Sequence, residues 1–374
     1  MYLLSVCSYL AAVKRTKKIF WRIEMKKYLL LALVLILAQT LMAGGGGQQS
    51  AATSGGTGPY ANLAPVTLVY GNGAANMAAG DLWGRYFVEA VEKITDGKIS
   101  INYFGNSQLG VDSELQQQML AGDIDIVSCQ PAQTTSFVPE VAVFDLPMVF
   151  ARYNAKTIDK ALNDSSFTRL INEGYARKGM ICLGFLQGAT FREMTSNKEI
   201  RSIRDFTGVR IRTMDARFHL MFWRALGANP TPLPFTELYM SLQQGVVDAQ
   251  ENANDTNVSA QFFEVQKFLV NTHHIIYLNQ FLMNKGKFDS LAPAYQAAVR
   301  EAVAQATGRL APDLQKINDD NKAIMIQRGM TSIEFPPSFY EEVIVRADEV
   351  YKAIRADIGN TIVDALIKEL EAAK

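Results

Sequence analysis

The feature that most constrains the fold is an alternation of strand-like and helix-like runs that begins near Leu63 and continues to about residue 282. Short β-rich segments are separated by stretches with helical periodicity, a pattern typical of an α/β protein. The alternation runs through two cycles that meet near residue 190. Two similar cycles predict two lobes with a ligand cleft between them.

Within this pattern the expected strands are residues 66–71, 98–104, 124–129, 180–186, 191–195, 208–213, 246–249 and 274–282. The expected helices are residues 77–94, 112–121, 154–175, 216–226 and 235–244. The C-terminal third is mostly helical: residues 290–328 form a long helical stretch that Pro312 must interrupt or kink. Residues 338–373 carry an apolar residue at every fourth position, which predicts one helix packed on the body by a single face.

The N-terminus has the pattern of a targeting segment. From Met25 a short basic start is followed by an apolar run over residues 28–43 and then by small residues, the three-part pattern of a signal peptide. We expect residues 1–43 to be the signal peptide, translation to start at Met25, and residues 44–62 to form a flexible linker rich in Gly and Ser. The mature protein is then soluble and periplasmic. A retained membrane anchor is the alternative, although the run is shorter than the roughly 20 residues that span a bilayer.

Charge and cysteine content exclude several classes of protein. The chain has 37 basic and 37 acidic residues, but residues 1–43 hold seven of the basic and one of the acidic ones. The remaining 30 basic and 36 acidic residues disfavour nucleic acid as a partner. The three cysteines have no metal-ligand spacing, and Cys129 and Cys182 lie in apolar runs, where buried free thiols are expected.

Motifs for catalysis and cofactors are weak or absent. The segment GNGAAN, residues 71–76, follows a strand and opens a helix, but it has Asn76 in place of the third glycine of a dinucleotide turn. We interpret it as a tight turn that presents Asn72 to a cleft. The three histidines have no ligand spacing, and no nucleophile elbow or phosphate-binding loop occurs. We therefore expect no metal and no cofactor.

The strongest local signal is the strand GVRIRT, residues 208–213. Alternation along a strand places Arg210 and Arg212 on one face. Two arginines on one face of a buried strand require an anion or solvent beside them, and the guanidinium fork matches a carboxylate. From the residues alone, a carboxylate site and a pair of exposed surface charges are equally good interpretations.

At this point the sequence resembles a known family. Residues 206–252 read FTGVRIRTMDARFHLMFWRALGANPTPLPFTELYMSLQQGVVDAQEN, and this closely resembles the solute-binding proteins of TRAP transporters, the DctP family. The similarity extends over the folded part through NSQLG (residues 106–110), FDLPMVF (144–150) and FFEVQKFL (262–269). Several linked motifs in one order are far more specific than any single motif.

The resemblance implies a two-lobed, periplasmic-binding-protein-like (type II) fold with hinge strands and long C-terminal helices. It implies lobe I over residues 63–189 and 278–317, and lobe II over residues 190–277 and 318–374. It also implies that an organic acid is held between the lobes by an arginine, and the position that matches this arginine is Arg212. The other matching ligand-binding positions are Arg192, Asn252, Phe235, Gln130 and Asn72.

Two departures concern the identity of the solute. Asp215 stands where some members, including sialic-acid binders, carry Asn, and Gln130 stands where those carry Glu. A carboxylate beside an acidic ligand fits best if it accepts hydrogen bonds from ligand hydroxyls, which favours a uronate or aldonate over sialic acid. We expect a monomeric binding protein that delivers an organic acid, such as a sugar acid or a C4-dicarboxylate, to a TRAP membrane permease. A ligand-presenting sensor and an enzyme acting on a carboxylate are the alternatives.

Overall fold

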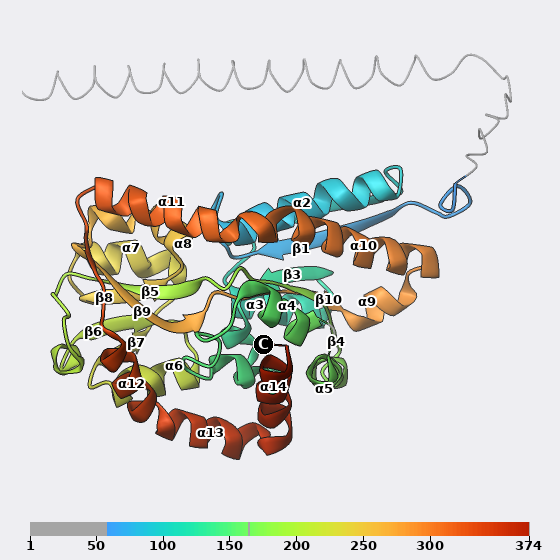
Figure 1. Cartoon of the computed structure of the whole chain (residues 1–374). Helices are drawn as coiled ribbons and strands as arrows, with labels where there is room; N and C mark the ends of the chain where they lie inside the picture. Colours follow the sequence, from blue (N-terminus) through green and yellow to red (C-terminus); the bar gives the residue numbers. More distant parts are fainter. Residues whose placement is uncertain (1–57, 164, 374) are drawn as a thin grey trace, which may run out of the picture. The chain divides into compact units, whose positions relative to one another are not determined.

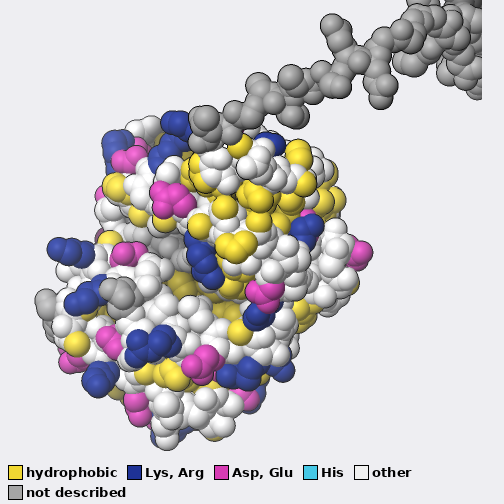
Figure 2. Space-filling model, turned by 90° about the vertical axis from the view of Figure 1, so that its right-hand side faces the viewer, with side chains coloured by type: hydrophobic (Ala, Val, Ile, Leu, Met, Phe, Trp, Pro, Cys, Tyr) yellow, Lys and Arg dark blue, Asp and Glu magenta, His cyan; other side chains and the backbone are white. Residues whose placement is uncertain are grey.

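The computed structural model describes residues 58–163 and 165–373 (Figure 1). The predicted signal peptide, the start at Met25 and most of the linker lie outside the described residues. Within the described part, no helix combines the length and the hydropathy needed to cross a membrane. On the face in Figure 2, basic and acidic side chains are interspersed, and hydrophobic ones gather on its upper part.

The first sheet has five strands in the order β2-β1-β3-β10-β4. Strands β1, β2 and β3 are parallel, and β10 runs antiparallel to both β3 and β4. Helices α2 (Ala79–Ile94) and α10 (Pro293–Leu310) pack against each other beside this sheet, over a core that includes Tyr70, Trp83, Phe87 and Phe281 (Figure 1). The strand bounds are β1 Val66–Asn72, β2 Ile99–Phe104, β3 Ile126–Cys129, β4 Met180–Leu186 and β10 Asn279–Asn284.

The second sheet has six strands in the order β11-β9-β5-β8-β6-β7. Strand β6 is parallel to β7 and β8, whereas β5 is antiparallel to β8 and β9. Its strand bounds are β5 Phe191–Ser196, β6 Arg210–Thr213, β7 Asn229–Pro232, β8 Ala249–Asn252, β9 Phe268–Ile276 and β11 Thr331–Ile333.

The chain crosses between the sheets at three places. Residues 187–190 join β4 to β5, and residues 277–278 join β9 to β10. Residues 311–313 join α10 to α11 (Leu314–Gln327), which leads to β11 in the second sheet. Because few segments connect the two sheets, each sheet with its helices forms one lobe. The predicted two-lobed α/β architecture is therefore confirmed.

A bulge interrupts β9 beside the second crossover. Arg192 of β5 pairs with Ile275, but Met194 pairs with Val270, so residues 271–274 of β9 oppose Glu193 alone. The bulge lets two adjacent histidines, His273 and His274, point to different surroundings. His274 is buried against Glu251, and His273 lies beside Glu193.

The remaining elements are mostly helices. Two helices, α4 and α5, replace the single helix predicted at residues 154–175. Ser165 caps α5, because its hydroxyl accepts a hydrogen bond from the Thr168 amide at 3.1 Å. The helix bounds are α2 Ala79–Ile94, α3 Asp112–Ala121, α4 Ala155–Asn163, α5 Ser166–Arg177, α6 Arg217–Ala225, α7 Phe235–Gln243, α8 Asn254–Ser259, α9 Lys285–Ser290, α10 Pro293–Leu310, α11 Leu314–Gln327, α12 Pro337–Arg346, α13 Asp348–Ile358 and α14 Asn360–Ala372.

The prediction of one helix over residues 338–373 was wrong. Three helices occupy this region, and Gly359, at φ 83°, ends α13 and turns the chain into α14. A positive φ is nearly free for glycine and costly for other residues. The apolar stripe nevertheless lies on two of these helices, α13 and α14. Helix α13 packs against α6, and α14 packs against α4 and α5. Residues 274–282, expected as one strand, are the end of β9 and the start of β10.

Candidate functional site

A cavity of about 290 Å³ lies where strands of both sheets end. Side chains at or just after the carboxyl ends of β1, β3, β6 and β8 line it, together with the start of α3 and the second crossover. The carboxyl ends of parallel strands are the usual place for ligands in α/β proteins. Six of the seven side chains predicted from the sequence line this cavity, namely Asn72, Gln130, Arg212, Asp215, Phe235 and Asn252.

Arg212 is the one positively charged side chain in the described lining of this cavity. Its side chain is 1% exposed, and its Nε and Nη2 donate to the carbonyl oxygen of Leu233 at 2.9 and 2.8 Å. Burial lowers the pKa of Arg212 to about 10, although the negative charge of Glu251 opposes this shift. Among the described residues, no carboxylate forms an ion pair with it. A buried cation without an ion-pair partner is costly, and an anion bound beside it would offset that cost.

Arg210, on the same strand, is different. Its guanidinium is about half exposed and pairs with Asp248 at 2.7 Å. The interpretation as an exposed surface charge therefore holds for Arg210, and only Arg212 reaches the cavity.

Arg192, the second predicted arginine, lies outside the cavity lining, beneath it. Its Nε is 2.5 Å from Oε2 of Glu251, and its Nη2 donates to Oε1 at 2.9 Å and to the Glu251 carbonyl at 2.6 Å. Its Nη1 donates to the side-chain oxygen of Gln130. Burial opposes ionisation of Glu251, but the charge of Arg192 and a hydrogen bond from His274 hold its pKa well below the usual range. Arg192 is thus already neutralised by a protein carboxylate.

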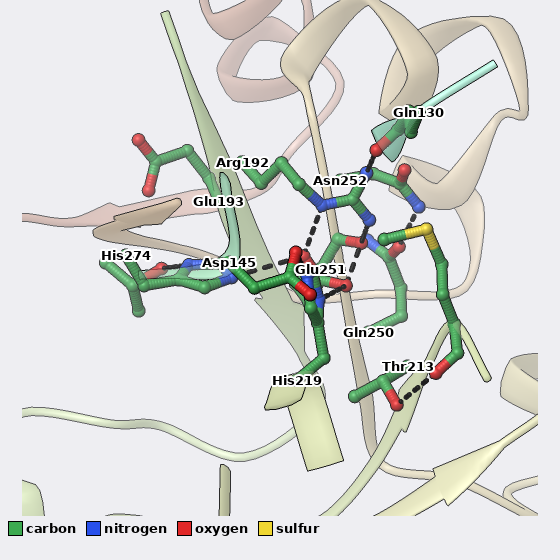
Figure 3. A network of polar contacts seen from close by, with 12 residues as sticks. Gln130, Asp145, Arg192, Glu193, Thr213, His219, Gln250, Glu251, Asn252 and His274 are labelled. Carbon is green, nitrogen blue, oxygen red and sulfur yellow. Dashed lines mark hydrogen bonds and ion pairs between the residues drawn. The ribbon is translucent and has the colours of Figure 1, made fainter. Parts of the chain in front are cut away.

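Arg192 and Glu251 belong to a larger network of polar contacts, which Figure 3 shows. Nε2 of His274 lies 3.2 Å from Oε2 of Glu251, and Nε2 of His219 lies 3.2 Å from Oδ1 of Asp145. Glu251 immediately precedes Asn252, whose amide donates to the side-chain oxygen of Gln250 at 2.8 Å. The network therefore fixes the end of β8, and with it the amide that reaches the cavity.

Asn72 shapes the opposite wall. Its side chain is 1% exposed, donates to the carbonyl of Gly80 at 2.9 Å and accepts from the amide of Ala74 at 2.7 Å. These two bonds close a tight turn after β1, as the sequence predicts. A Cβ on Gly73 would lie 2.1 Å from Oδ1 of Asp112, so a larger residue at this position would require the Asp112 side chain to move.

Asp112, at the start of α3, also lines the cavity, although its sequence context does not mark it as a site residue. Burial raises the pKa of its carboxyl to about 6, against the opposing effects of the Gln130 amide, Arg192 and Arg212. An acidic residue in the first turn of a helix is an ordinary feature, so its type and position do not mark it. The only signal was its place just after the NSQLG motif.

The rest of the lining supplies apolar contacts and neutral hydrogen-bonding groups. Phe235 contributes one wall, and Ser128, Gln133, Thr256 and Asn279 contribute polar groups. Cys129 also lines the cavity, but burial raises the pKa of its thiol well above the usual range, so it is not a reactive nucleophile. Cys129 and Cys182 are both buried and free, as predicted. Across the described residues, no cluster of His, Cys, Asp or Glu could hold a metal ion.

A cleft between two α/β lobes, with one buried cation among hydrogen-bonding groups, is the architecture of a solute-binding protein. The family model "Bacterial extracellular solute-binding protein, family 7" matches residues 74–357. The chain belongs to this family, the DctP solute-binding proteins, and the prediction from its motifs is confirmed. Members of the family bind solutes outside the cytoplasm.

Individual relatives cover most of the chain. The 2,3-diketo-L-gulonate-binding periplasmic protein of Escherichia coli is 28% identical over 83% of this chain and 90% of its own length. The C4-dicarboxylate-binding periplasmic protein of Rhodobacter capsulatus is 28% identical over 77% of this chain and 84% of its own length. The crystal structure of a sugar-acid-binding protein from Advenella mimigardefordensis in complex with galactonate superposes with a TM-score of 0.78, at 27% identity, over 84% of this chain and all of the other.

Proposed function

We propose that this protein captures a small organic carboxylate in the cavity around Arg212 and delivers it to a TRAP membrane permease. The observation that carries the proposal is the buried guanidinium of Arg212, which lines the cavity and has no carboxylate partner among the described residues. Bidentate pairing with a ligand carboxylate would supply the missing negative charge.

Within the carboxylates, a hydroxylated monoacid is the ligand we favour. The lining holds one unpaired cation, Arg212, and two carboxylates, Asp112 and Asp215. A second carboxylate on the ligand would face these two negative groups, whereas hydroxyls could donate to them. The relatives that bind galactonate and 2,3-diketo-L-gulonate support a sugar acid, and the C4-dicarboxylate-binding relative keeps a dicarboxylate as the second candidate.

Capture would proceed by closure of the two lobes around the ligand. Asn72, Asp112 and Gln130 come from one lobe, and Arg212, Asp215 and Asn252 from the other, so a bound acid touches both. Only a ligand with different affinity for the open and closed states can shift the equilibrium between them. Closure removes water from around Arg212, and the lower local dielectric strengthens its ion pair with the ligand. Within this proposal Arg192 keeps a supporting role toward the ligand carboxylate, through its contact with Gln130.

We further propose that the chain is exported to the periplasm, acts as a monomer and is not an enzyme. The cavity lining contains no histidine or lysine, and its one cysteine is buried with a raised pKa, which supports binding without turnover. A sensor that presents the same ligand to a receptor would use the same cavity, so neighbouring permease genes distinguish transport from sensing.

A thermal-shift screen of the purified protein tests the proposal. The ligands are galactonate, galacturonate, 2-keto acids and succinate. After incubation, each ligand is recovered and analysed for chemical change. We expect stabilisation by a sugar acid and its recovery unchanged. Absence of stabilisation by every carboxylate would overturn the binding proposal, and conversion of the ligand would establish an enzyme instead.

A further inference from the structure

A second cavity, of about 500 Å³, lies on the other side of strand β5. Side chains alternate along β5: Arg192 points toward Glu251 and Gln130, while Phe191 and Glu193 on either side of it line the second cavity. Residues in or near all three crossovers contribute to its wall. Thr190 lies in the first crossover, His273 of β9 lies just before the second, and Asn318 of α11 lies just after the third. Any change in the angle between the lobes must therefore change the shape of this cavity.

Three residues of the second cavity have a strained backbone. Met148, Ala189 and His273 all line the second cavity, and all three have positive φ, at 63°, 52° and 47°. A non-glycine residue with a positive φ is strained, and it persists only where its surroundings hold it. Here the surroundings include a hydrogen bond from the Met148 amide to the His274 carbonyl, at 2.8 Å.

The bulge 271–274 forms the physical link from this cavity to the ligand cleft. His273 faces Glu193 in the second cavity, and the next residue, His274, contacts Glu251. Glu251 in turn holds Arg192 and precedes Asn252, which lines the cleft. A molecule that presses on Met148 or His273 thus acts on His274 through the shared backbone, and through it on the end of β8.

The charges and rings of the second cavity indicate what it would bind. Glu193 has both oxygens engaged by His273: the backbone amide donates at 2.9 Å, and Nδ1 lies 2.5 Å from the other oxygen. Both oxygens of the Glu193 carboxylate are therefore already in contact with His273. Arg152 is an exposed cation of the lining, and it has no ion pair with any side chain that the structure describes. The rings of Phe191 and Tyr340 supply the apolar wall, with Tyr340 stacked on His273 at 5.7 Å.

We propose that the cavity behind β5 is a second ligand site, for a small aromatic carboxylate, and that its occupant tightens binding in the cleft through the bulge 271–274. The carboxylate would pair with Arg152, and the ring would pack on Phe191 and Tyr340. An occupant that fits the cavity stabilises the lobe arrangement in which both cavities are formed. This inference rests on the proposed function only for the coupling, because the second site has its own residues.

Binding to the second site is tested with 4-fluorobenzoate as the probe. Its ¹⁹F line width is measured with the Arg212→Ala variant, in which the cleft has lost its cation. We expect broadening that Ile344→Trp, which fills the second cavity, abolishes and that Arg152→Ala weakens at least tenfold. Arg204→Ala, at an exposed arginine outside both linings, is the matched control and should leave the broadening unchanged. If the tryptophan variant does not fold, the Arg152 variant and its control decide the question.

Absence of broadening, or broadening that survives both cavity variants, overturns the second site. Coupling is then measured in the otherwise unmodified protein as the dissociation constant for galactonate with and without saturating 4-fluorobenzoate. We expect a decrease of about fivefold or more, and an equal effect of galactonate on the probe, since coupling is reciprocal. An unchanged constant overturns the coupling. If no carboxylate binds the cleft at all, the proposed function fails instead, and the line-width experiment still reports on the second site.

Discussion

Arg212 and Leu233 form a bidentate contact in which Nε and Nη2 of one guanidinium donate to one carbonyl oxygen, at 2.9 and 2.8 Å. This contact fixes one edge of the guanidinium plane by the backbone before any ligand arrives. The remaining N–H groups are those that an incoming carboxylate can use. A side chain oriented in advance loses little conformational entropy on binding, so the site is preorganised.

The first prediction concerns Arg212 itself. Arg212→Ala should abolish the thermal stabilisation by a sugar acid, because it removes the only unpaired cation in the described part of the cavity lining, while the unliganded protein stays folded. Arg212→Lys should also reduce affinity by at least tenfold, since an ammonium cannot contact the Leu233 carbonyl and a carboxylate with the same planar geometry. Arg210→Ala is the matched control on the same strand. Stabilisation that persists in Arg212→Ala would place the carboxylate anchor elsewhere.

The second prediction concerns the raised pKa of Asp112, about 6 in the folded protein against an ordinary value of 3.8. Between these values the folded state binds more protons than the unfolded state, so the stability contributed by this group falls as pH rises from about 4 to 6. Asp112→Asn removes that loss. The variant should melt about 1–2 °C above the unmodified protein at pH 7.5 and level with it near pH 4, without ligand.

Ligand affinity gives an independent readout of the same group. Ionised Asp112 repels a dicarboxylate, so succinate should bind more tightly as pH falls through 6, and Asp112→Asn should flatten that dependence. A sugar acid that donates a hydroxyl to Asp112 should bind Asp112→Asn less tightly. Titration calorimetry at pH 5.5 and 7.5 measures both effects, and pH profiles that do not differ between the two proteins would contradict the assignment.

The sequence predicted much of the fold because hydrophobic periodicity is local. Helix α3 and strand β4 occupy the ranges expected for them, and the apolar stripe of residues 350–370 is buried as its spacing indicates, except for the partly buried Ile358. It could not predict the turn at Gly359, because a glycine within a helical pattern is compatible with either a continuous helix or a C-cap. The choice depends on the packing of α14 against α4 and α5, which are distant in sequence.

The cleft residues show the same limit. Alternation places Arg210 and Arg212 on one face, but it does not show which of the two pairs with a protein carboxylate. The carboxylate that pairs with Arg210 belongs to Asp248, which lies 38 residues away in the sequence. Likewise, the family motifs point to Arg192 as a ligand residue, and they do not reveal that Glu251 occupies most of its donors. The raised pKa of Asp112 could not be predicted from the sequence, because it depends on tertiary burial. The roles of these residues toward a ligand stay predictions.

The third prediction tests the buried ion pair of Arg192 and Glu251, whose side chains are 1% and 0% exposed. Glu251→Gln should lower the free energy of unfolding by about 3–5 kcal/mol, because it leaves a buried cation without its counter-charge. The double variant Arg192→Met, Glu251→Leu should recover most of that loss, since it removes both charges. Urea denaturation at pH 7 measures all three proteins. A cost below about 1 kcal/mol for Glu251→Gln would show that the pair is dispensable.

The last prediction concerns the first crossover, where Gly188 passes α11. A Cβ at Gly188 would lie 2.4 Å from Cβ of Leu314 and 3.1 Å from its Cδ1. The nearest atom is attached directly to the backbone of α11 and Leu314 is buried, so a rotamer change cannot relieve the overlap. Gly188→Ala should therefore cost about 1–3 kcal/mol of unfolding free energy. Gly308→Ala, within α10 and with open space around its Cβ position, should instead stabilise by about 0.5–1 kcal/mol.

Because residues next to Gly188 join the two lobes, the displaced α11 should also weaken sugar-acid binding, measured by calorimetry on the same pair of variants. Equal stability and equal affinity in the two variants would show that the crossover tolerates a wider separation from α11.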